Sequence, residues 1–299
     1  MKPTLLVGLL LGLLLPTLPA CSSVPQTEKS GEQYAQIAGN NPREIVFVHG
    51  MFVTPACWEN WETRFKNAGY QVSAPAWPLH EGSIADLRKP ERMATLGKLE
   101  LTQVLDYYRA LLKAKPVKPI LIGHSMGGLI VQILLAEGLA QAAVAVDSAP
   151  PNGVIWLNWS FIKSNWGAIN PFANSEQPIE LDVDQFSYAF LNQEDPSARQ
   201  KIYDEFYVPE SRRIGKAPTT DAAKINVTRA RGPLLIVAGG GDHIIPAKLN
   251  YKNFEFYSES PAYTEFKLFE GRDHWTLGAS GWQDVAASID QWLSARFAH

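Results

Sequence analysis

Gly123-His124-Ser125-Met126-Gly127 is the stretch that decides the fold, because of the segments on either side of it. Before it, Pro119-Ile120-Leu121-Ile122 is a short apolar run typical of a buried parallel strand. After it, apolar residues recur at helical spacing, namely Met126, Leu129, Ile130, Ile133 and Leu134. A Gly-x-Ser-x-Gly sequence between a strand and a helix predicts a nucleophile elbow, a tight turn from which the serine hydroxyl projects clear of the backbone. Ser125 is therefore the predicted nucleophile.

A second buried strand is predicted at Glu44-Ile45-Val46-Phe47-Val48, and it leads into His49-Gly50-Met51-Phe52. In this position a His-Gly-x loop supplies one backbone N–H to a tetrahedral oxyanion, and the residue after the nucleophile supplies another. We therefore predict an oxyanion hole made by the backbone N–H groups of Met51 and Met126. Phe52 is the alternative to Met51.

Two further strands end in residues suited to acid and base chemistry. Pro233-Leu234-Leu235-Ile236-Val237-Ala238 is a buried run that opens into Gly239-Gly240-Gly241-Asp242-His243-Ile244-Ile245-Pro246. Phe266-Lys267-Leu268-Phe269 alternates as a half-exposed edge strand does, and Glu270-Gly271-Arg272-Asp273-His274 follows it. These loops supply a candidate acid, Asp242, and a candidate base, His274.

The order of these three residues along the chain resembles that of the α/β-hydrolases, and differs from the chymotrypsin and subtilisin orders. The resemblance runs from about Asn41 to the C-terminus. It is to bacterial lipase, esterase and non-haem-peroxidase-like members that carry a helical cap. It implies an α/β fold with a mostly parallel central sheet, helices on both faces and an inserted cap. It also implies a serine hydrolase that cleaves a small-molecule carboxylic ester through an acyl-enzyme, with no cofactor.

Asp147 is an alternative acid, because this superfamily can place the carboxylate after either of two strands. The glycine-rich lead and the trailing Pro246 favour Asp242. Asp273 directly precedes His274 and is expected to structure the loop. The remaining histidines are expected to have other roles: His49 and His124 pack or hydrogen-bond within their motifs, His243 points away from the site, and His80 is a solvated loop residue near the entrance.

The alternation of strands and helices breaks between Pro151 and about Gly232, and we assign the insertion 151–232 to a cap. The segment is rich in aromatic residues, and its Asp182-to-Leu191 part is expected to be helical. A cap in this position closes a site from water and shapes an apolar pocket. Most of its aromatic side chains are expected to pack the cap onto the core.

The N-terminus is predicted to carry an export signal. Lys2 precedes the apolar run Leu5–Leu15, which is too short to span a bilayer and is typical of a signal peptide. Leu18-Pro19-Ala20-Cys21 resembles the lipobox of bacterial lipoproteins, in which the cysteine becomes the lipidated N-terminus. An ordinary signal peptide is the alternative.

We therefore predict a lipoprotein signal peptide over 1–20, lipidation of Cys21, and a polar tether over 21–40 before the hydrolase domain at 41–299. This organisation implies an exported bacterial lipoprotein. Its lipid would hold it at a membrane of the cell envelope, the outer membrane if the host has one.

Composition excludes several other classes. The net charge of −3 and the lack of a basic cluster argue against nucleic-acid binding. No His-x-x-His or Cys-x-x-Cys pattern indicates a metal site. If Cys21 is lipidated, Cys57 is the remaining thiol, and it is expected to be buried.

Two alternatives to ester hydrolysis stay open at this point. The same three residues can serve C–C bond hydrolysis or perhydrolysis. A catalytically silent envelope lipoprotein that binds through the cap groove is the other alternative.

Overall fold

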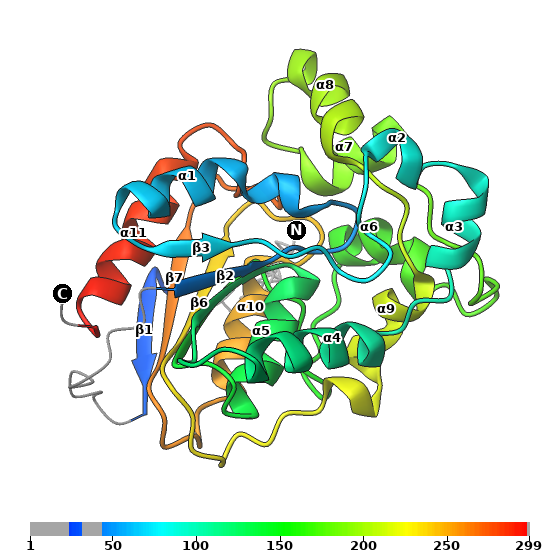
Figure 1. The fold of residues 1–299 in the computed structure, drawn as a ribbon. Helices are drawn as coiled ribbons and strands as arrows, with labels where there is room; N and C mark the ends of the chain where they lie inside the picture. The colour runs from blue at the N-terminus through cyan, green and yellow to red at the C-terminus, as the bar shows by residue number, and fades with distance from the viewer. Residues whose placement is uncertain (1–23, 32–43, 298–299) are drawn as a thin grey trace, which may run out of the picture.

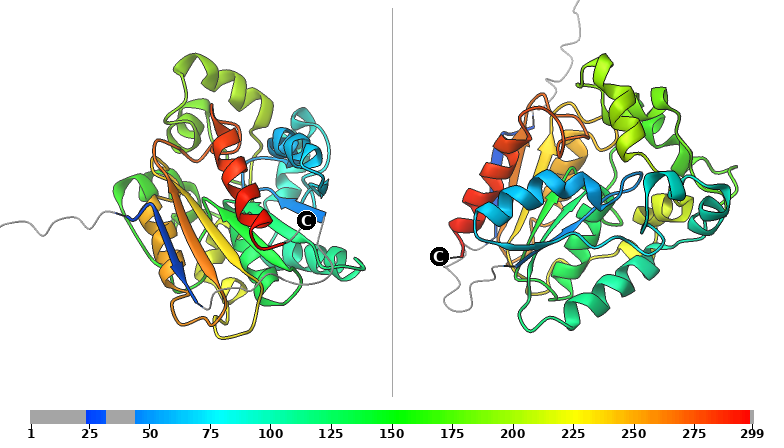
Figure 2. Two further views of the ribbon diagram at one scale, coloured as in Figure 1. Left: turned by 90° about the vertical axis from the view of Figure 1, so that its left-hand side faces the viewer. Right: turned by 45° about the horizontal axis from the view of Figure 1, so that its top comes forward.

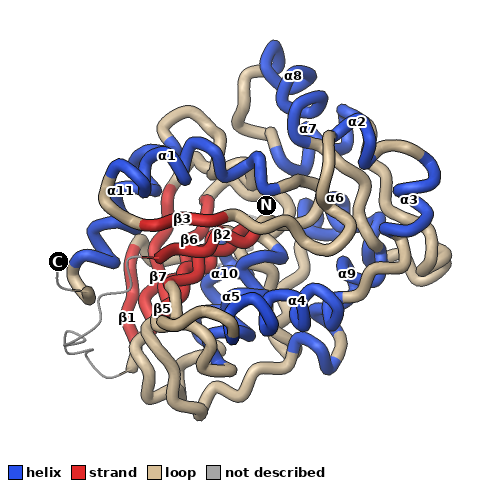
Figure 3. Tube along the Cα trace, viewed as in Figure 1, coloured by secondary structure: helices blue, strands red, loops and turns tan. Residues whose placement is uncertain are grey.

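A seven-stranded sheet runs through the middle of the protein, with helices on both of its faces (Figures 1 and 3). The computed structural model describes residues 24–31 and 44–297. The strand order is β1-β7-β6-β5-β4-β2-β3, and every neighbouring pair is parallel except β1 with β7. In chain order the strands are β1 Thr27–Ser30, β2 Glu44–Val48, β3 Gln71–Ser73, β4 Ile120–His124, β5 Ala142–Val146, β6 Leu234–Gly239 and β7 Thr264–Phe269.

Helices α1 and α11 cover one face of the sheet, and α4, α5 and α10 cover the other (Figure 1). Their bounds are α1 Glu59–Asn67, preceded by the 3₁₀ turn η1 Pro55–Trp58, α4 Leu101–Lys113, α5 Met126–Ala136, α10 Ala247–Glu255 and α11 Trp282–Ser294. The short helices α2 Ile84–Leu87 and α3 Pro90–Leu96 lie between β3 and α4. This arrangement confirms the predicted α/β fold.

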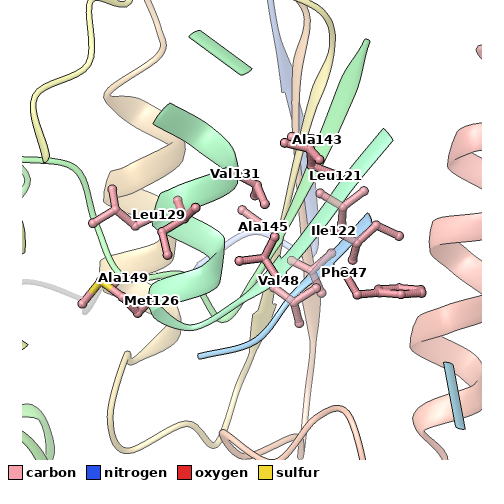
Figure 4. Packing of buried hydrophobic residues seen from close by; sticks show 14 of the residues in the cluster. Phe47, Val48, Leu121, Ile122, Met126, Leu129, Val131, Ala143, Ala145 and Ala149 are labelled. Carbon is pink, nitrogen blue, oxygen red and sulfur yellow. The ribbon is translucent and has the colours of Figure 1, made fainter. Parts of the chain in front are cut away.

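The centre of the sheet is buried on both sides, as expected for parallel strands covered by helices. All residues of β4 and β5 are buried, and so are all residues of α5. Figure 4 shows α5 packed against the sheet, where β5 presents the small side chains Ala143 and Ala145. On the opposite face, Phe47 stacks on Trp58, with 4.7 Å between the ring centroids. The elbow therefore lies between a strand and a helix whose residues are all buried.

The predicted edge strand at Phe266–Phe269 is not an edge. It belongs to β7, and β1 pairs with its outer side in antiparallel orientation, with Thr27 opposite Lys267. Thr27–Ser30 also lies within the segment predicted as a polar tether. A polar edge strand is held by backbone hydrogen bonds on one side, so its side chains carry no apolar pattern that reveals it.

The signal peptide, the lipidated Cys21 and most of the predicted tether lie outside the described residues. Within 24–31 and 44–297, none of the helices combines the length and apolarity needed to cross a bilayer.

The cap lies between β5 and β6 and covers the carboxyl end of the sheet (Figure 1). It consists of α6 Trp159–Ile169, α7 Val183–Phe190, α8 Pro196–Phe206, α9 Arg212–Lys216 and the 3₁₀ turns η2 Ala217–Thr219 and η3 Asp221–Ala223. Contacts with the core hold it: the N–H of Val208 donates to the carbonyl of Phe52 at 2.9 Å, and Arg88 donates to the carbonyl of Tyr203 at 2.7 Å. Parallel strands point their carboxyl ends toward this cap, so residues after several strands meet beneath it.

Candidate active site

Ser125 stands at the turn between β4 and α5 in a strained backbone conformation, with φ 57° and ψ −122°. Glycine is required two residues before and two residues after Ser125, because a side chain at either position would clash with backbone atoms. A Cβ at Gly123 would lie 2.2 Å from the carbonyl oxygen of Gly127, and a Cβ at Gly127 would lie 2.2 Å from the carbonyl oxygen of Val48. Strain of this kind persists where the surrounding structure holds it, here between a buried strand and a buried helix. The turn thus presents Ser125 at the carboxyl edge of the sheet.

The loop after β2 passes directly against Ser125. A Cβ at Gly50 would lie 2.7 Å from the Cβ of Ser125, so no other residue fits there without a shift. Met51 and Met126 line the same cavity as Ser125. Met126 is the first residue of α5, so its N–H has no acceptor within the helix and lies at the positive end of the helix dipole. The structure therefore brings together Ser125 and both residues of the predicted oxyanion hole.

Asp242 and His274 form a buried pair at the ends of β6 and β7. Nδ1 of His274 donates to Oδ2 of Asp242, and the two atoms are 2.6 Å apart. The other carboxylate oxygen, Oδ1, accepts from the N–H groups of Ile244 at 2.7 Å and Ile245 at 2.9 Å. With its proton on Nδ1, His274 keeps a lone pair on Nε2. That atom is buried and has no hydrogen-bond partner among the described residues.

Burial acts on both members of this pair by disfavouring charge. It lowers the pKa of His274 to about 3 and raises the pKa of Asp242 well above its usual value. The N–H groups of Ile245 and Ile244 oppose this effect on Asp242, because they stabilise the carboxylate. The result is a neutral imidazole held by an oriented acid.

His124, the residue before Ser125, connects the elbow to the His274 loop. Its Nε2 donates to the backbone carbonyl of His274 at 2.9 Å, and the two rings lie 4.6 Å apart between centroids. Burial lowers the pKa of His124 well below its usual value, so the ring stays neutral. From the cap, Phe190 packs edge-on against His274 with 5.0 Å between centroids. The elbow, the cap and the His274 loop therefore meet at one point.

Asp147, the alternative acid, is buried at the end of β5 but has a different partner. Its Oδ1 accepts from the N–H of Gly239 at 2.6 Å and so ties the ends of β5 and β6 together. Burial, reinforced by the nearby carboxylate of Asp242, raises the pKa of Asp147 well above its usual value. The structure gives Asp242, and not Asp147, the hydrogen bond to His274.

Asp273 structures the loop and also binds the cap. Its Oδ1 accepts from the N–H of Trp275 at 3.1 Å, and its Oδ2 accepts from the N–H of Gln193 at 2.8 Å. Burial raises the pKa of Asp273 to about 7. Its role is therefore to join the cap to the loop that carries His274.

The other histidines make structural contacts. His49 donates from Nδ1 to the carbonyl of Gly50 at 2.9 Å and accepts at Nε2 from the N–H of Trp77 at 3.2 Å. His243 donates from Nδ1 to the carbonyl of Tyr188 at 2.9 Å.

The prediction that His80 is solvated is wrong. His80 is 1% exposed, and its Nε2 lies 3.0 Å from Oε2 of the buried Glu210 in the cap. Burial by itself lowers the pKa of His80, but the Glu210 carboxylate outweighs it, so the pKa lies above its usual value. No local pattern pairs residues 130 positions apart, and sequence reasoning therefore missed Glu210.

A cavity of about 600 Å³ opens beside Ser125, between the core and the cap. Its described lining holds no Asp, Glu, Lys, Arg or His. Phe52 and Met126 contribute from the core, and α6 contributes Phe161 and Ala168. Its polar side chains besides Ser125 are Asn152, Ser164, Asn165 and Thr219. The cavity suits an uncharged, largely apolar molecule.

Comparison with known proteins places these features in context. Residues 45–288 match the model of a family described as the alpha/beta hydrolase family. No curated protein sequence matches the chain.

Solved structures with the same fold include three of low sequence identity. A monoacylglycerol lipase from Paleococcus ferrophilus is 20% identical with a TM-score of 0.60, over 90% of this chain and 98% of that chain. Polyneuridine aldehyde esterase is 15% identical with a TM-score of 0.61, over 83% and 98%. Tomato methylketone synthase I in complex with 2-tridecanone is 14% identical with a TM-score of 0.64, over 85% and 98%. The family match spans both the elbow and the Asp242–His274 pair, and the chain belongs to the alpha/beta hydrolase family.

Proposed function

We propose that this protein is a serine hydrolase that cleaves uncharged, apolar carboxylic esters through an acyl-enzyme. Ser125 is the nucleophile, His274 the base and Asp242 the acid that orients His274. The observation that carries the proposal is the position of Ser125 on a strained elbow, at the floor of an uncharged cavity, in a chain that also buries an Asp242–His274 hydrogen bond of 2.6 Å. Structural likeness to a monoacylglycerol lipase and an esterase agrees with this chemistry.

We propose the following reaction for these three residues. Ser125 Oγ attacks the ester carbonyl carbon while His274 Nε2 accepts the hydroxyl proton. The negative charge that develops on the carbonyl oxygen is stabilised by the N–H groups of Met51 and Met126. Collapse of the tetrahedral intermediate breaks the bond to the alkoxide, which leaves as the alcohol with the proton from His274. Water then attacks the acyl-enzyme by the same route, releasing the carboxylic acid and restoring Ser125.

The cavity argues for the substrate class. Transferring an unpaired charge into an apolar site costs far more free energy than transferring an ester, whose carbonyl is a weak acceptor. Substrates with a charged acyl or alcohol group are therefore disfavoured. Apolar chains gain about 0.8 kcal/mol for each buried methylene group, so longer acyl groups are favoured until the cavity is full.

The test uses a fluorophosphonate probe and a series of p-nitrophenyl esters of graded chain length. The probe should label the wild type, and Ser125→Ala should abolish both labelling and turnover while the protein stays folded. Ser258→Ala, at an exposed serine, is the matched control and should behave as the wild type. Turnover that survives in a folded Ser125→Ala variant would contradict the mechanism.

We also propose that the protein is an envelope lipoprotein acylated at Cys21. The support is the apolar run Leu5–Leu15 followed by Leu-Pro-Ala-Cys. Expressed in a bacterium with its own leader, the protein should fractionate with membranes, and the mature N-terminus should carry acyl mass. If the protein is recovered in a soluble form that lacks acyl mass, its leader is an ordinary signal peptide and the lipoprotein proposal is wrong.

A further inference from the structure

Five large apolar side chains are exposed in one short part of the cap. They are Ile155 at 70%, Leu157 at 60%, Trp159 at 75%, Trp166 at 53% and Phe172 at 94% exposed. We call this set the apolar cap surface. Elsewhere in the described residues, Val117 is the other exposed large apolar side chain, at 40%. Soluble proteins seldom concentrate exposed aromatic groups in this way without a binding role.

The apolar cap surface borders the mouth of the active-site cavity. Ile155 and Leu157 are exposed and also line the cavity that contains Ser125. Helix α6 has two faces: Phe161 and Ala168 point into the cavity, whereas Trp159 and Trp166, about two turns apart, share the outer face. An apolar molecule that leaves the outer surface therefore meets the cavity without crossing a charged zone.

Charge is nearly absent from this segment. Residues 151–175 contain one charged residue, Lys163, and no Asp or Glu, although 19% of the whole chain is charged. Lys163 Nζ lies 3.5 Å from the centroid of the Tyr188 ring, so its charge is directed onto an aromatic face. The exposed aromatic residues are interspersed with Asn and Ser. Trp side chains and small polar side chains are suited to the boundary between lipid headgroups and acyl chains. Carboxylates at this boundary would be repelled by anionic lipid.

Helix α10 connects the N-terminal end of the described chain to Trp156, which lies between two members of this surface in sequence. Strand β1 is bound to α10 by a hydrogen bond from Tyr251 to Glu28, and the two elements lie side by side in the left view of Figure 2. The next residue of α10, Lys252, lies 5.9 Å from the centroid of the Trp156 ring, between Ile155 and Leu157 in sequence. Cys21 is three residues before Val24, a reach of about 10 Å. An anchor at Cys21 would hold this side of the protein at a membrane.

We propose that the apolar cap surface docks on a lipid bilayer and places the mouth of the cavity at the boundary between headgroups and acyl chains. Apolar esters then pass from the bilayer to Ser125 without entering water. This second step rests on the proposed esterase function, whereas docking itself does not require catalysis.

Docking is tested with the full chain reconstituted in vesicles of phosphatidylethanolamine and phosphatidylglycerol. Lipids brominated on their acyl chains quench tryptophans that reach the acyl boundary. Quenching is expected in the wild type and in Ser125→Ala, and it should be largely lost in the variant Trp159→Phe with Trp166→Phe. The control is Trp282→Phe, because Trp282 stacks on Trp61 on another face of the protein. Equal quenching in the double variant and the wild type would overturn docking through this surface.

A second variant measures the consequence for activity. Replacing Trp159, Trp166 and Phe172 by serine should lower the rate on a long-chain ester embedded in vesicles by about tenfold or more. The rate on a short-chain, water-soluble ester should stay unchanged, because these three residues do not line the cavity. Val117→Ser is the matched control and should change neither rate.

The two proposals fail in different ways. If the triple variant hydrolyses both esters at the wild-type rates, docking is overturned and the esterase function stands. Absence of hydrolysis of either ester by the wild type overturns the esterase function, while quenching still reports docking. If sedimentation shows a dimer that the triple variant abolishes, and the wild type shows no quenching, the surface binds a second copy of the chain and the lipid proposal is wrong.

Discussion

Nε2 of His124 donates a hydrogen bond to the backbone carbonyl of His274, and 2.9 Å separates the two atoms. The residue before the proposed nucleophile thereby holds the backbone of the proposed base, across 150 positions of sequence. His124 also packs its ring against that of His274. The elbow and the base are thus positioned by one shared, buried contact.

Replacing His124 by alanine should therefore lower kcat/KM by about 10- to 100-fold. A buried acceptor left without its donor costs about 1–3 kcal/mol, and the freed loop no longer holds His274 in place. Because His124 does not line the cavity, KM should change little compared with kcat. Steady-state kinetics on a soluble ester separates the two. A folded variant with wild-type kcat would contradict this positioning role.

Asp242→Asn should reduce the rate by about 10⁴-fold, the size of the corresponding change in a serine protease. The amide has a single acceptor oxygen. If that oxygen accepts from Nδ1–H of His274, the NH₂ group faces the N–H groups of Ile244 and Ile245, and donors then oppose donors. His274 therefore loses its tautomer and orientation.

Asp147→Asn should have a much smaller effect. Burial raises the pKa of Asp147 and so favours the protonated form, which an amide resembles, and Asn can still accept from the N–H of Gly239. The reverse order of the two rates, measured on folded variants, would transfer the role of the acid to Asp147.

The pH dependence should follow the lowered pKa of His274. The base must be neutral to accept the proton of Ser125, and burial lowers its pKa from 6.5 to about 3. Activity should therefore persist below pH 6.5, where an exposed histidine would already be protonated. A profile of kcat/KM against pH tests this, with far-UV circular dichroism at each pH as the control for unfolding. An acid limb centred at or above pH 6.5 would contradict the prediction.

The cap should depend on the buried His80–Glu210 pair. Removing one partner of a buried ion pair costs about 3–5 kcal/mol, because the other group must either keep an uncompensated charge or give up its proton. Glu210→Gln should lower the free energy of unfolding by this amount, as measured by urea denaturation. Glu205→Gln, at an exposed position of α8, is the control and should be nearly neutral.

The contribution of the His80–Glu210 pair to stability also depends on pH. The pKa of His80 is raised in the folded state, so its contribution to stability is fully present below 6.5, and it is lost as pH rises through the folded pKa. The difference in stability between wild type and Glu210→Gln should therefore shrink toward alkaline pH. A difference that grows with pH would show that the pair carries no such charge.

The short apolar strands and the residues after them could be predicted from the sequence because the signals are local. The run before Ser125 and the helical spacing after it determine a strand, a turn and a helix without reference to the rest of the chain. Gly123 follows from the same local geometry, since a Cβ there would clash with the backbone of Gly127, whereas Gly127 is required by the carbonyl of Val48 in the neighbouring strand β2. A break in the alternation of strands and helices predicted an insertion over 151–232, and helices α6 to α9 lie within these residues.

Other features could not be predicted, because they depend on which segments meet in space. The polar strand Thr27–Ser30 has no side-chain pattern, and only its hydrogen bonds to β7 define it. Sequence kept both Asp242 and Asp147 as candidate acids, since each follows a strand. The side-by-side arrangement of β5, β6 and β7 decides that Asp242 reaches His274 while Asp147 binds Gly239.

By itself, then, the sequence determined the kind of fold, the identity of the elbow serine and the small set of residues that could serve it. The tertiary structure decided which of these residues touch, that His80 is buried against Glu210, and that the exposed side chains Ile155 and Leu157 line the cavity of Ser125. The physical reason is the range of the interactions. Turns, strands and helices follow from neighbours in the chain, whereas burial, pKa shifts and buried hydrogen bonds depend on groups that only the packed fold brings within a few ångströms of one another.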